Sequence, residues 1–345
     1  MAAFERLAEV WRGDVVESVH FGVAAVANAD GEVIHGWGDP SFVTYPRSSL
    51  KPVQAVMLVE SGAAKTYGLS ARHVSLACAS HTAESFHAEM VHEWLGRLDL
   101  SEDGLACGPD YPRDEEAVFD LVRAGKPKSR ILHNCSGKHC GYLTVARHQG
   151  WDVEGYNERS HPTQALYTEV LSELLGSDAN SLPFGVDGCS LPAPALPVGD
   201  MARVMARFAA AKVSAPQRKD AIREIQAAVR LYPQYMSGTT HPTARIADAT
   251  NGQVIMKTGA EGYLVAFLPE QQLGIALKVA DGDSRARVIA LLALLRQLDL
   301  LPRDAVAELA SISEVPVRNS VNSVVGRVRP CAGPHLTLVD GTVSG

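Results

Sequence analysis

The chain of 345 residues is 46% hydrophobic and 21% charged, so it can bury a large core as one big domain or two closely joined ones. Its formal net charge is −7 with no run of lysine or arginine, which argues against nucleic acid or an anionic membrane as a partner. The N-terminus carries acids and arginines where a signal peptide needs an apolar core, and no later run is long and apolar enough to cross a bilayer, so we expect a cytoplasmic protein. Six cysteines are too few for a disulfide framework, so we expect reduced thiols.

Strand-forming sequence lies near both ends of the chain. Residues 18–37 mix apolar and polar side chains around Asn28-Ala29-Asp30-Gly31, which predicts a β-hairpin whose turn is marked by Asp30-Gly31. Near the other end, the pattern predicts strands at residues 254–257, 263–268 and 273–280 and then an apolar helix over 283–300.

The middle of the chain shows helical periodicity instead. Amphipathic patterns, with Gly, Pro and Asn at most of the breaks, predict helices at residues 69–79, 83–98, 114–124, 137–148, 163–175, 200–211 and 216–231. We therefore expect an α/β (α+β) fold in which strands from both termini form one antiparallel sheet around a helical insert. No internal repeat or clear boundary appears, so we predict a single domain over residues 1–345 with a helical subregion at about 63–250.

The segment from Tyr45 to Val59 places a serine and a lysine three residues apart at the start of an almost wholly apolar helix. At that spacing Ser48 and Lys51 share one helix face, near unpaired backbone N–H groups and the positive end of the helix dipole. This field and burial both lower a lysine pKa, so Lys51 could take the proton of Ser48 and leave it able to attack an acyl carbon. With Ser49 as N-cap, Pro52 falls in the first turn, where proline is tolerated. The alternative is a plain helix start that the serines only cap.

Lys257-Thr258-Gly259 at the end of a predicted strand is a second chemical motif. A Ser-x-x-Lys helix start, a helical middle and a Lys-Thr-Gly strand resemble, in that order, the class A β-lactamases and penicillin-binding proteins. In those enzymes the lysine and the hydroxyl steer the substrate carboxylate and support proton transfer. The alternative for Lys257 is an exposed lysine at a strand end.

Ser80-His81-Thr82 stands where those enzymes have Ser-Asp-Asn. Ser80 could supply a bridging hydroxyl between the two lysines, or act as a second nucleophile with Lys257 as its base. It could also simply cap the next helix, which is common at such a junction.

Two glycine-bracketed loops, at residues 133–140 and 185–190, bring together thiols, an imidazole and a carboxylate that could bind a soft or borderline metal. Their spacing matches no standard zinc pattern. Cys135 and Lys138 could share a helix face, and a lysine ligand would require a lowered pKa. The alternative is buried thiols at a tight turn. The cysteines expected to be structural are Cys78, Cys107, Cys140 and Cys331.

Together these segments resemble the Rhizobium-type (class 3) L-asparaginases over roughly residues 15–325. The matching stretches are 45–54 (YPRSSLKPVQ), 79–81 (ASH), 133–139 (HNCSGKH), 187–189 (DGC) and 257–262 (KTGAEG). The resemblance implies a serine-β-lactamase-like fold, a homodimer, and hydrolysis of L-asparagine to L-aspartate and ammonia. It implies two Ser-Lys tandems, Ser48 with Lys51 and Ser80 with Lys257, beside one zinc ion held by Cys135, Lys138 and Cys189. The substrate-pocket residues that it suggests are Arg47, Gly137, His139, Asp187 and Glu261.

The mechanism expected from this resemblance is nucleophilic. Ser48 would attack the side-chain amide carbon with neutral Lys51 as base, and water would then hydrolyse the acyl-enzyme. Ser80 and Lys257 would relay protons, while zinc would orient the α-groups of the substrate. Other classes stay open: a penicillin-recognising serine hydrolase (β-lactamase or peptidase), another small-amide hydrolase such as a glutaminase, and a non-catalytic binding module.

Overall fold

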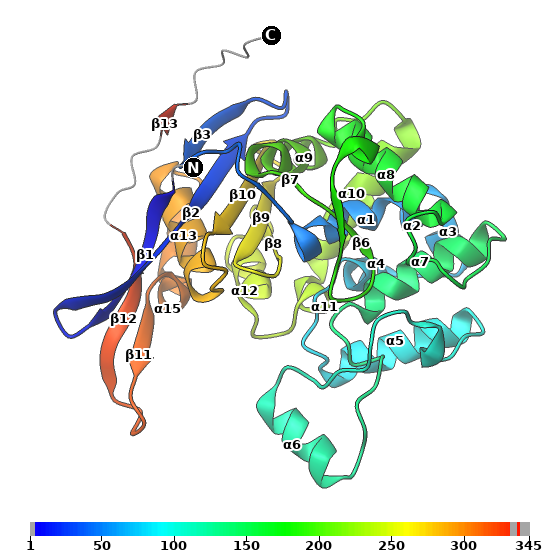
Figure 1. Cartoon of the computed structure of the whole chain (residues 1–345), viewed down its shortest axis with the longest axis horizontal. Helices are drawn as coiled ribbons and strands as arrows, with labels where there is room; N and C mark the ends of the chain where they lie inside the picture. The colour runs from blue at the N-terminus through cyan, green and yellow to red at the C-terminus, as the bar shows by residue number, and fades with distance from the viewer. Residues whose placement is uncertain (1–3, 332–336, 339–345) are drawn as a thin grey trace. The chain divides into compact units, whose positions relative to one another are not determined.

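The computed structural model describes residues 4–331 and 337–338, and the chain divides into two compact units. The first unit comprises residues 1–49, 195–212 and 245–345, and the second comprises residues 50–194 and 213–244. In the first unit, strands from both ends of the chain, drawn in blue and in yellow to red in Figure 1, belong to one sheet. The single domain expected over residues 1–345 stays a prediction.

The sheet of the first unit is antiparallel throughout. Within the described residues its strands are β1 (Glu5–Arg12), β2 (Val15–Ala27), β3 (Val33–Trp37), β8 (Ile255–Thr258), β9 (Tyr263–Leu268), β10 (Leu273–Val279), β11 (Val315–Arg318), β12 (Val324–Pro330) and β13 (Thr337–Leu338). Their order is β11-β12-β1-β2-β10-β9-β8, with β3 paired to β2 and β13 paired to β3. This confirms the predicted sheet from both termini and the hairpin that turns at Asp30-Gly31, whereas β1, β11 and β12 were not predicted.

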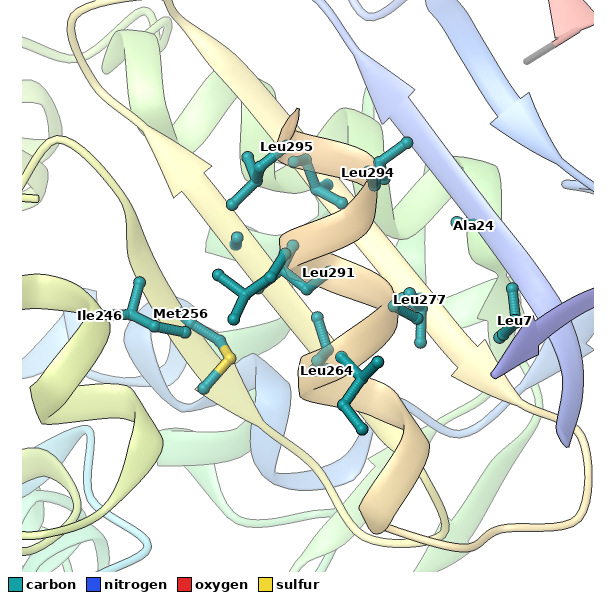
Figure 2. Packing of buried hydrophobic residues seen from close by; sticks show 14 of the residues in the cluster. Leu7, Ala24, Ile246, Met256, Leu264, Leu277, Leu291, Leu294 and Leu295 are labelled. Atoms are coloured by element: carbon teal, nitrogen blue, oxygen red, sulfur yellow. The ribbon is translucent and has the colours of Figure 1, made fainter. Parts of the chain in front are cut away.

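Two helices cover opposite faces of this sheet, because successive residues of a strand point to opposite sides. On one face the buried cluster, seen in Figure 2, includes Leu264, Ala266 and Leu268 of β9 with Leu291, Leu294 and Leu295 of α13 (Arg285–Gln297). On the other face the ring of Phe267 lies 5.2 Å from that of Phe208 in α9 (Val198–Ala210). α9 approaches β10 so closely that a Cβ at Gly274 would lie 2.1 Å from the backbone nitrogen of Ala206. The remaining elements of this unit are β4 (Val43–Thr44), β7 (Leu196–Pro197), α14 (Arg303–Glu308) and α15 (Ala310–Ser313).

The second unit is mainly helical. Its elements are α1 (Lys51–Gln54), α2 (Val56–Glu60), α3 (Ala63–Thr66), α4 (Ala71–Ala77), α5 (Ser85–Arg97), η2 (Glu102–Gly104), α6 (Glu115–Arg123), α7 (Ser136–His148), α8 (Pro162–Leu175), η3 (Ala179–Ser181), β5 (Phe184–Val186), β6 (Pro192–Pro194), α10 (Pro216–Leu231) and α11 (Pro233–Met236). α12 (Pro242–Ala249) crosses the boundary between the units. The helices predicted for the middle of the chain are all present. The helix predicted at 200–211 is α9, which packs on the sheet of the first unit rather than within the helical insert.

All six cysteines are free thiols, which confirms the prediction of reduced cysteines. Among the residues that the structure describes, no helix combines the length and the apolarity needed to cross a bilayer.

Arg218 of α10 joins three helices of the second unit and gives a prediction about stability. Its side chain is 8% exposed and bonds both carboxylate oxygens of Glu60 in α2 at 2.9 Å, and also Glu169 and Glu173 in α8. Arg218→Leu is expected to lower the free energy of unfolding by about 2–4 kcal/mol, because it leaves the mostly buried carboxylates of Glu60 and Glu173 without their counter-charge. Urea unfolding followed by circular dichroism measures this loss.

The matched control for Arg218 is Arg123, which pairs with Asp120 on the surface of α6. The two side chains are 69% and 75% exposed, so Arg123→Leu is expected to cost less than about 0.5 kcal/mol. Equal losses for the two variants would contradict the stabilising role assigned to Arg218.

Candidate active site

The Ser-x-x-Lys segment begins with a short 3₁₀ helix. Residues Arg47–Leu50 form this helix (η1), and α1 follows at Lys51 with Pro52 in its first turn, as predicted. The predicted serine cap is wrong, because the N-cap of α1 makes no side-chain hydrogen bond. The buried hydroxyl of Ser49 instead donates to the backbone oxygen of Lys257, 3.3 Å away. A tertiary contact therefore occupies the hydroxyl that was expected to cap the helix.

The amine of Lys51 ends among several acceptors inside the second unit. Its side chain is 0% exposed, and Nζ lies 2.9 Å from Oγ of Ser80 and 3.1 Å from Sγ of Cys135. It also donates to the backbone oxygen of Ala79. Burial lowers the pKa of Lys51, and the negative charge of Cys135 opposes that effect. A buried amine in contact with a serine hydroxyl is a pair that can transfer a proton.

Ser80 lies on the loop between α4 and α5, residues 79–84, which we call the Ser80 loop. The backbone nitrogen of Ser80 donates to the carbonyl of Met236 (3.0 Å), and that of His81 donates to the carbonyl of Asn134 (3.1 Å). The alternative in which Ser80 caps the next helix is wrong, because the N-cap of α5 is Glu84. Ser80 thus carries a partly exposed hydroxyl on a loop that backbone hydrogen bonds from Ser80 and His81 hold in place.

Two thiols and an amine meet at the start of α7. Nζ of Lys138 lies 2.9 Å from Sγ of Cys189, and Cys189 hydrogen-bonds to Cys135. That hydrogen bond and the charges of Lys51 and Lys138 lower the pKa of Cys135 well below its usual range, whereas the pKa of Cys189 is raised by the same hydrogen bond and by burial. Cys135 and Cys189 are both buried, so the alternative of buried thiols at a tight turn stays open beside that of a metal site.

The neighbouring thiols as well as burial set the pKa of Lys138. Burial alone would lower the pKa of Lys138, but the charges of Cys189 and Cys135 outweigh burial and raise it. The donor set nevertheless fits zinc, since two sulfurs and one amine in mutual contact are soft enough and leave a fourth position open. In the part of the chain that the structure describes, no three His, Cys, Asp or Glu side chains gather into a metal-binding group.

His139 stands directly after Lys138 and is fully buried. Its Nδ1 lies 2.6 Å from the hydroxyl of Tyr156, and its Nε2 has no hydrogen-bond partner among the described residues. Burial and the charge of Lys138 lower the pKa of His139 well below its usual range. A buried ring nitrogen without a partner is a group that a bound ligand can satisfy.

Asp187 and Gly137, two further residues expected at the substrate pocket, have local structural roles. The carboxylate of Asp187 accepts hydrogen bonds from the backbone nitrogen of Gly188 (2.7 Å) and from Sγ of Cys189 (3.7 Å). A Cβ on Gly137 would lie 2.4 Å from the carbonyl oxygen of Leu76, so only glycine allows α7 to approach α4 this closely.

Lys257 of β8 is 1% exposed, so the alternative of an exposed strand-end lysine is wrong. Its Nζ donates to the backbone oxygen of Thr258 (2.8 Å), and the guanidinium of Arg287 donates to the carbonyl of Gly259 (2.7 Å). At the end of this turn Glu261 has a φ of +53°, and its exposed carboxylate lies 4.0 Å from the partly buried guanidinium of Arg47, a weak ion pair. These contacts hold the Lys-Thr-Gly turn rigidly within the first unit.

The predicted site residues are divided between the two units. The first unit contains Arg47, Ser48, Lys257 and Glu261, and the second contains Lys51, Ser80, Cys135, Gly137, Lys138, His139, Asp187 and Cys189. Sequence reasoning did not single out Ser136, Tyr156 or Arg287, which bond to His81, His139 and the Lys-Thr-Gly turn. No local pattern marks such residues, because their partners are far away in the sequence or lie in another element.

Serine hydroxyls and buried lysine amines are groups that can act as a nucleophile and as a base. The sequence matches the family described as L-asparaginase II over residues 8–330, so the chain belongs to this family. That membership confirms the resemblance stated above and makes the protein an amidohydrolase of the L-asparaginase type.

Solved structures similar to this chain include a β-lactamase from Mycobacterium bovis, with 17% identity, 85% of this chain and 95% of that chain covered, and a TM-score of 0.41. Another is the protein named Mglu, with 16% identity, coverage of 81% and 67%, and a TM-score of 0.47. No curated protein sequence matches the chain.

Proposed function

We propose that this chain hydrolyses L-asparagine to L-aspartate and ammonia. The observation that carries the proposal is the fully buried amine of Lys51, which contacts the hydroxyl of Ser80 at 2.9 Å and follows Ser48 by three residues. Family membership supports hydrolysis of an amide as the reaction. The buried amine of Lys51, whose pKa is lowered, supports the presence of a base for that reaction.

In the proposed mechanism Oγ of Ser48 attacks the side-chain amide carbon of asparagine, and Lys51 takes the serine proton. Backbone N–H groups at the helix start hold the oxyanion. The C–N bond then breaks, and the nitrogen leaves as ammonia with a proton relayed by Ser80 and Lys257. Water attacks the resulting ester, returns a proton to Ser48 through Lys51, and releases aspartate. The contact of Lys51 with Ser80 supports this relay, because it gives the proton taken from Ser48 a direct route to a second hydroxyl.

Substrate recognition in this proposal uses Arg47, Gly137, His139, Asp187 and Glu261. The unpartnered Nε2 of His139 supports its inclusion, since a polar group of the substrate would satisfy it. Cys135, Lys138 and Cys189 would hold one zinc ion, and zinc bound there would supply positive charge that orients the α-groups of the amino acid.

Ammonia release over a panel of amides tests the function. Purified protein is assayed with L-asparagine, L-glutamine and small linear amides, and nitrocefin is included as a β-lactam substrate. We expect asparagine to give the highest kcat/KM and nitrocefin to remain intact. A glutamine preference would make the enzyme a glutaminase, nitrocefin cleavage would make it a penicillin-recognising hydrolase, and no turnover of any amide would support a binding module.

Zinc content gives a separate prediction. Protein purified without chelator is expected to contain about one zinc per chain by emission spectrometry, while Cys135→Ser and Cys189→Ser contain little, because each removes one of three ligands. Cys331→Ser, a thiol outside the cluster, is the control and should keep its zinc. Chelation is expected to raise KM more than it lowers kcat. This is the pattern expected when an interaction that stabilises the bound substrate and the transition state equally is lost. Absence of stoichiometric zinc, or an unchanged KM after chelation, would overturn this assignment.

The proposal also includes a homodimer in the cytoplasm. Light scattering coupled to size-exclusion chromatography measures the assembly, and a monomeric mass at micromolar concentration would contradict the dimer.

A further inference from the structure

His81 is a fully buried imidazole whose two ring nitrogens bond to different loops. Its Nδ1 accepts a hydrogen bond from the backbone nitrogen of Ala83 (3.1 Å), within the Ser80 loop. The proton of the neutral ring therefore lies on Nε2, which donates to Oγ of Ser136 at 2.9 Å. Ser136 in turn donates to the carbonyl of Ile131 at 2.9 Å, so the direction of every bond in this chain is set.

Ser136 is the first residue of α7 and the last of residues 131–136, a segment that we call the Cys135 loop. The backbone links the two loops as well, through the bond from the nitrogen of His81 to the carbonyl of Asn134. Each loop presents one polar atom to Nζ of Lys51: Oγ of Ser80 at 2.9 Å and Sγ of Cys135 at 3.1 Å. A shift of either loop would therefore change what the amine of Lys51 contacts.

The Ser80 loop also contains backbone strain next to His81. Ala83 has a φ of +61°, in the left-handed region that a residue with a Cβ rarely adopts. Such a conformation persists only where surrounding contacts hold it, and the hydrogen bond from Ala83 to the imidazole is one of them.

We propose that His81 is a positioning residue that fastens the Ser80 loop to the Cys135 loop and thereby keeps Ser80 and Cys135 on the amine of Lys51. The proposal rests on the proposed function, in which Ser80 and Lys51 relay protons. His81 itself takes no proton in the reaction. Its hydrogen bond to Ser136 makes the link, so the link needs both side chains.

His87 offers a matched control because it is a neighbouring buried imidazole whose hydrogen bond, described next, goes to neither loop. Its ring stacks on that of His81, with centroids 4.9 Å apart and an interplanar angle of 16°, and its Nε2 donates to the carbonyl of Gln234 at 3.0 Å. Replacing His87 removes a buried imidazole and its stacking without cutting the link from His81 to Ser136.

The test is a double-mutant cycle on His81 and Ser136. Asn at position 81 can still accept the hydrogen bond from Ala83, as short amides do in such turns, but it is too short to reach Ser136. We expect His81→Asn and Ser136→Ala each to lower kcat for L-asparagine by about 10- to 100-fold with KM changed less than about threefold, since misplaced groups lose rate. The double variant should be no slower than the slower single variant, because the two residues act as one unit. His87→Asn should keep kcat within about threefold.

A second readout does not depend on catalysis. Each chelator-treated protein is reacted with iodoacetamide, and the alkylation rate of Cys135 is followed by mass spectrometry of its peptide. We expect faster alkylation in His81→Asn and Ser136→Ala than in the wild type or His87→Asn, because the Cys135 loop has lost its side-chain link to the Ser80 loop. Multiplicative kcat losses in the cycle, or equal alkylation rates in all four proteins, would overturn the proposal. If the wild type hydrolyses no amide yet the alkylation pattern appears, the proposed function fails while the fastening role stands.

Discussion

Ser48→Ala is expected to lower kcat for L-asparagine by about 10⁴-fold or more, because no acyl-enzyme can form without the attacking hydroxyl. The fold should remain, since Ser48 lies partly exposed in the 3₁₀ turn before α1, and removal of one such hydroxyl costs about 1 kcal/mol or less. Coupled ammonia detection measures the rate, and thermal unfolding checks the fold.

Ser49→Ala is the control for this result, as it removes the neighbouring hydroxyl and its bond to the carbonyl of Lys257. We expect it to keep kcat within about tenfold of the wild type. If Ser48→Ala also stays within about tenfold, Ser48 is not the nucleophile, and Ser80, which contacts Lys51 directly, takes that role.

Lys51→Met gives the second large effect. We expect kcat to fall by about 10³-fold or more, because the base that takes the serine proton is gone. The melting temperature is expected to fall by a few degrees, since the thioether leaves the buried carbonyl of Ala79 and the thiol of Cys135 without their donor, and the saved cost of desolvating the amine offsets only part of this loss. Steady-state kinetics and calorimetry on the same preparation measure both quantities.

Lys138→Met distinguishes the role of a zinc ligand, proposed for Lys138, from the role of a base, proposed for Lys51. It removes a second buried amine of the second unit, the one that contacts Cys189, and is expected to raise KM and abolish zinc binding with a smaller effect on kcat. A loss of kcat as large as that of Lys51→Met would show that the two lysines act as one group, and the role of Lys51 as base would have to be shared.

The sequence by itself determined much of the fold, because the signals for helices, strands and turns are local. The amphipathic pattern of residues 216–231 coincides with α10, and the apolar run of 263–268 coincides with β9. The strands β1 and β12 escaped prediction although each also forms a hairpin with a neighbour in the sequence, and their pairing with each other, with Ala8 opposite Pro330, joins the two ends of the chain and has no local signal. Periodicity likewise predicted the helix at 200–211, but its placement on the sheet of the first unit depends on Gly274 of a distant strand.

The candidate site shows the same division. Motif spacing and family resemblance predicted Ser48, Lys51, Ser80, Lys257 and the three zinc candidates. Such residues can be predicted because the proposed chemistry requires particular residue types at particular spacings. Only the tertiary structure decided what each side chain contacts. The amine of Lys51 meets Ser80 and Cys135 across separations of 29 and 84 residues, and thiols beside Lys138 raise its pKa where burial alone would lower it. Contacts and charges at such separations arise when the chain packs, so no local pattern encodes them.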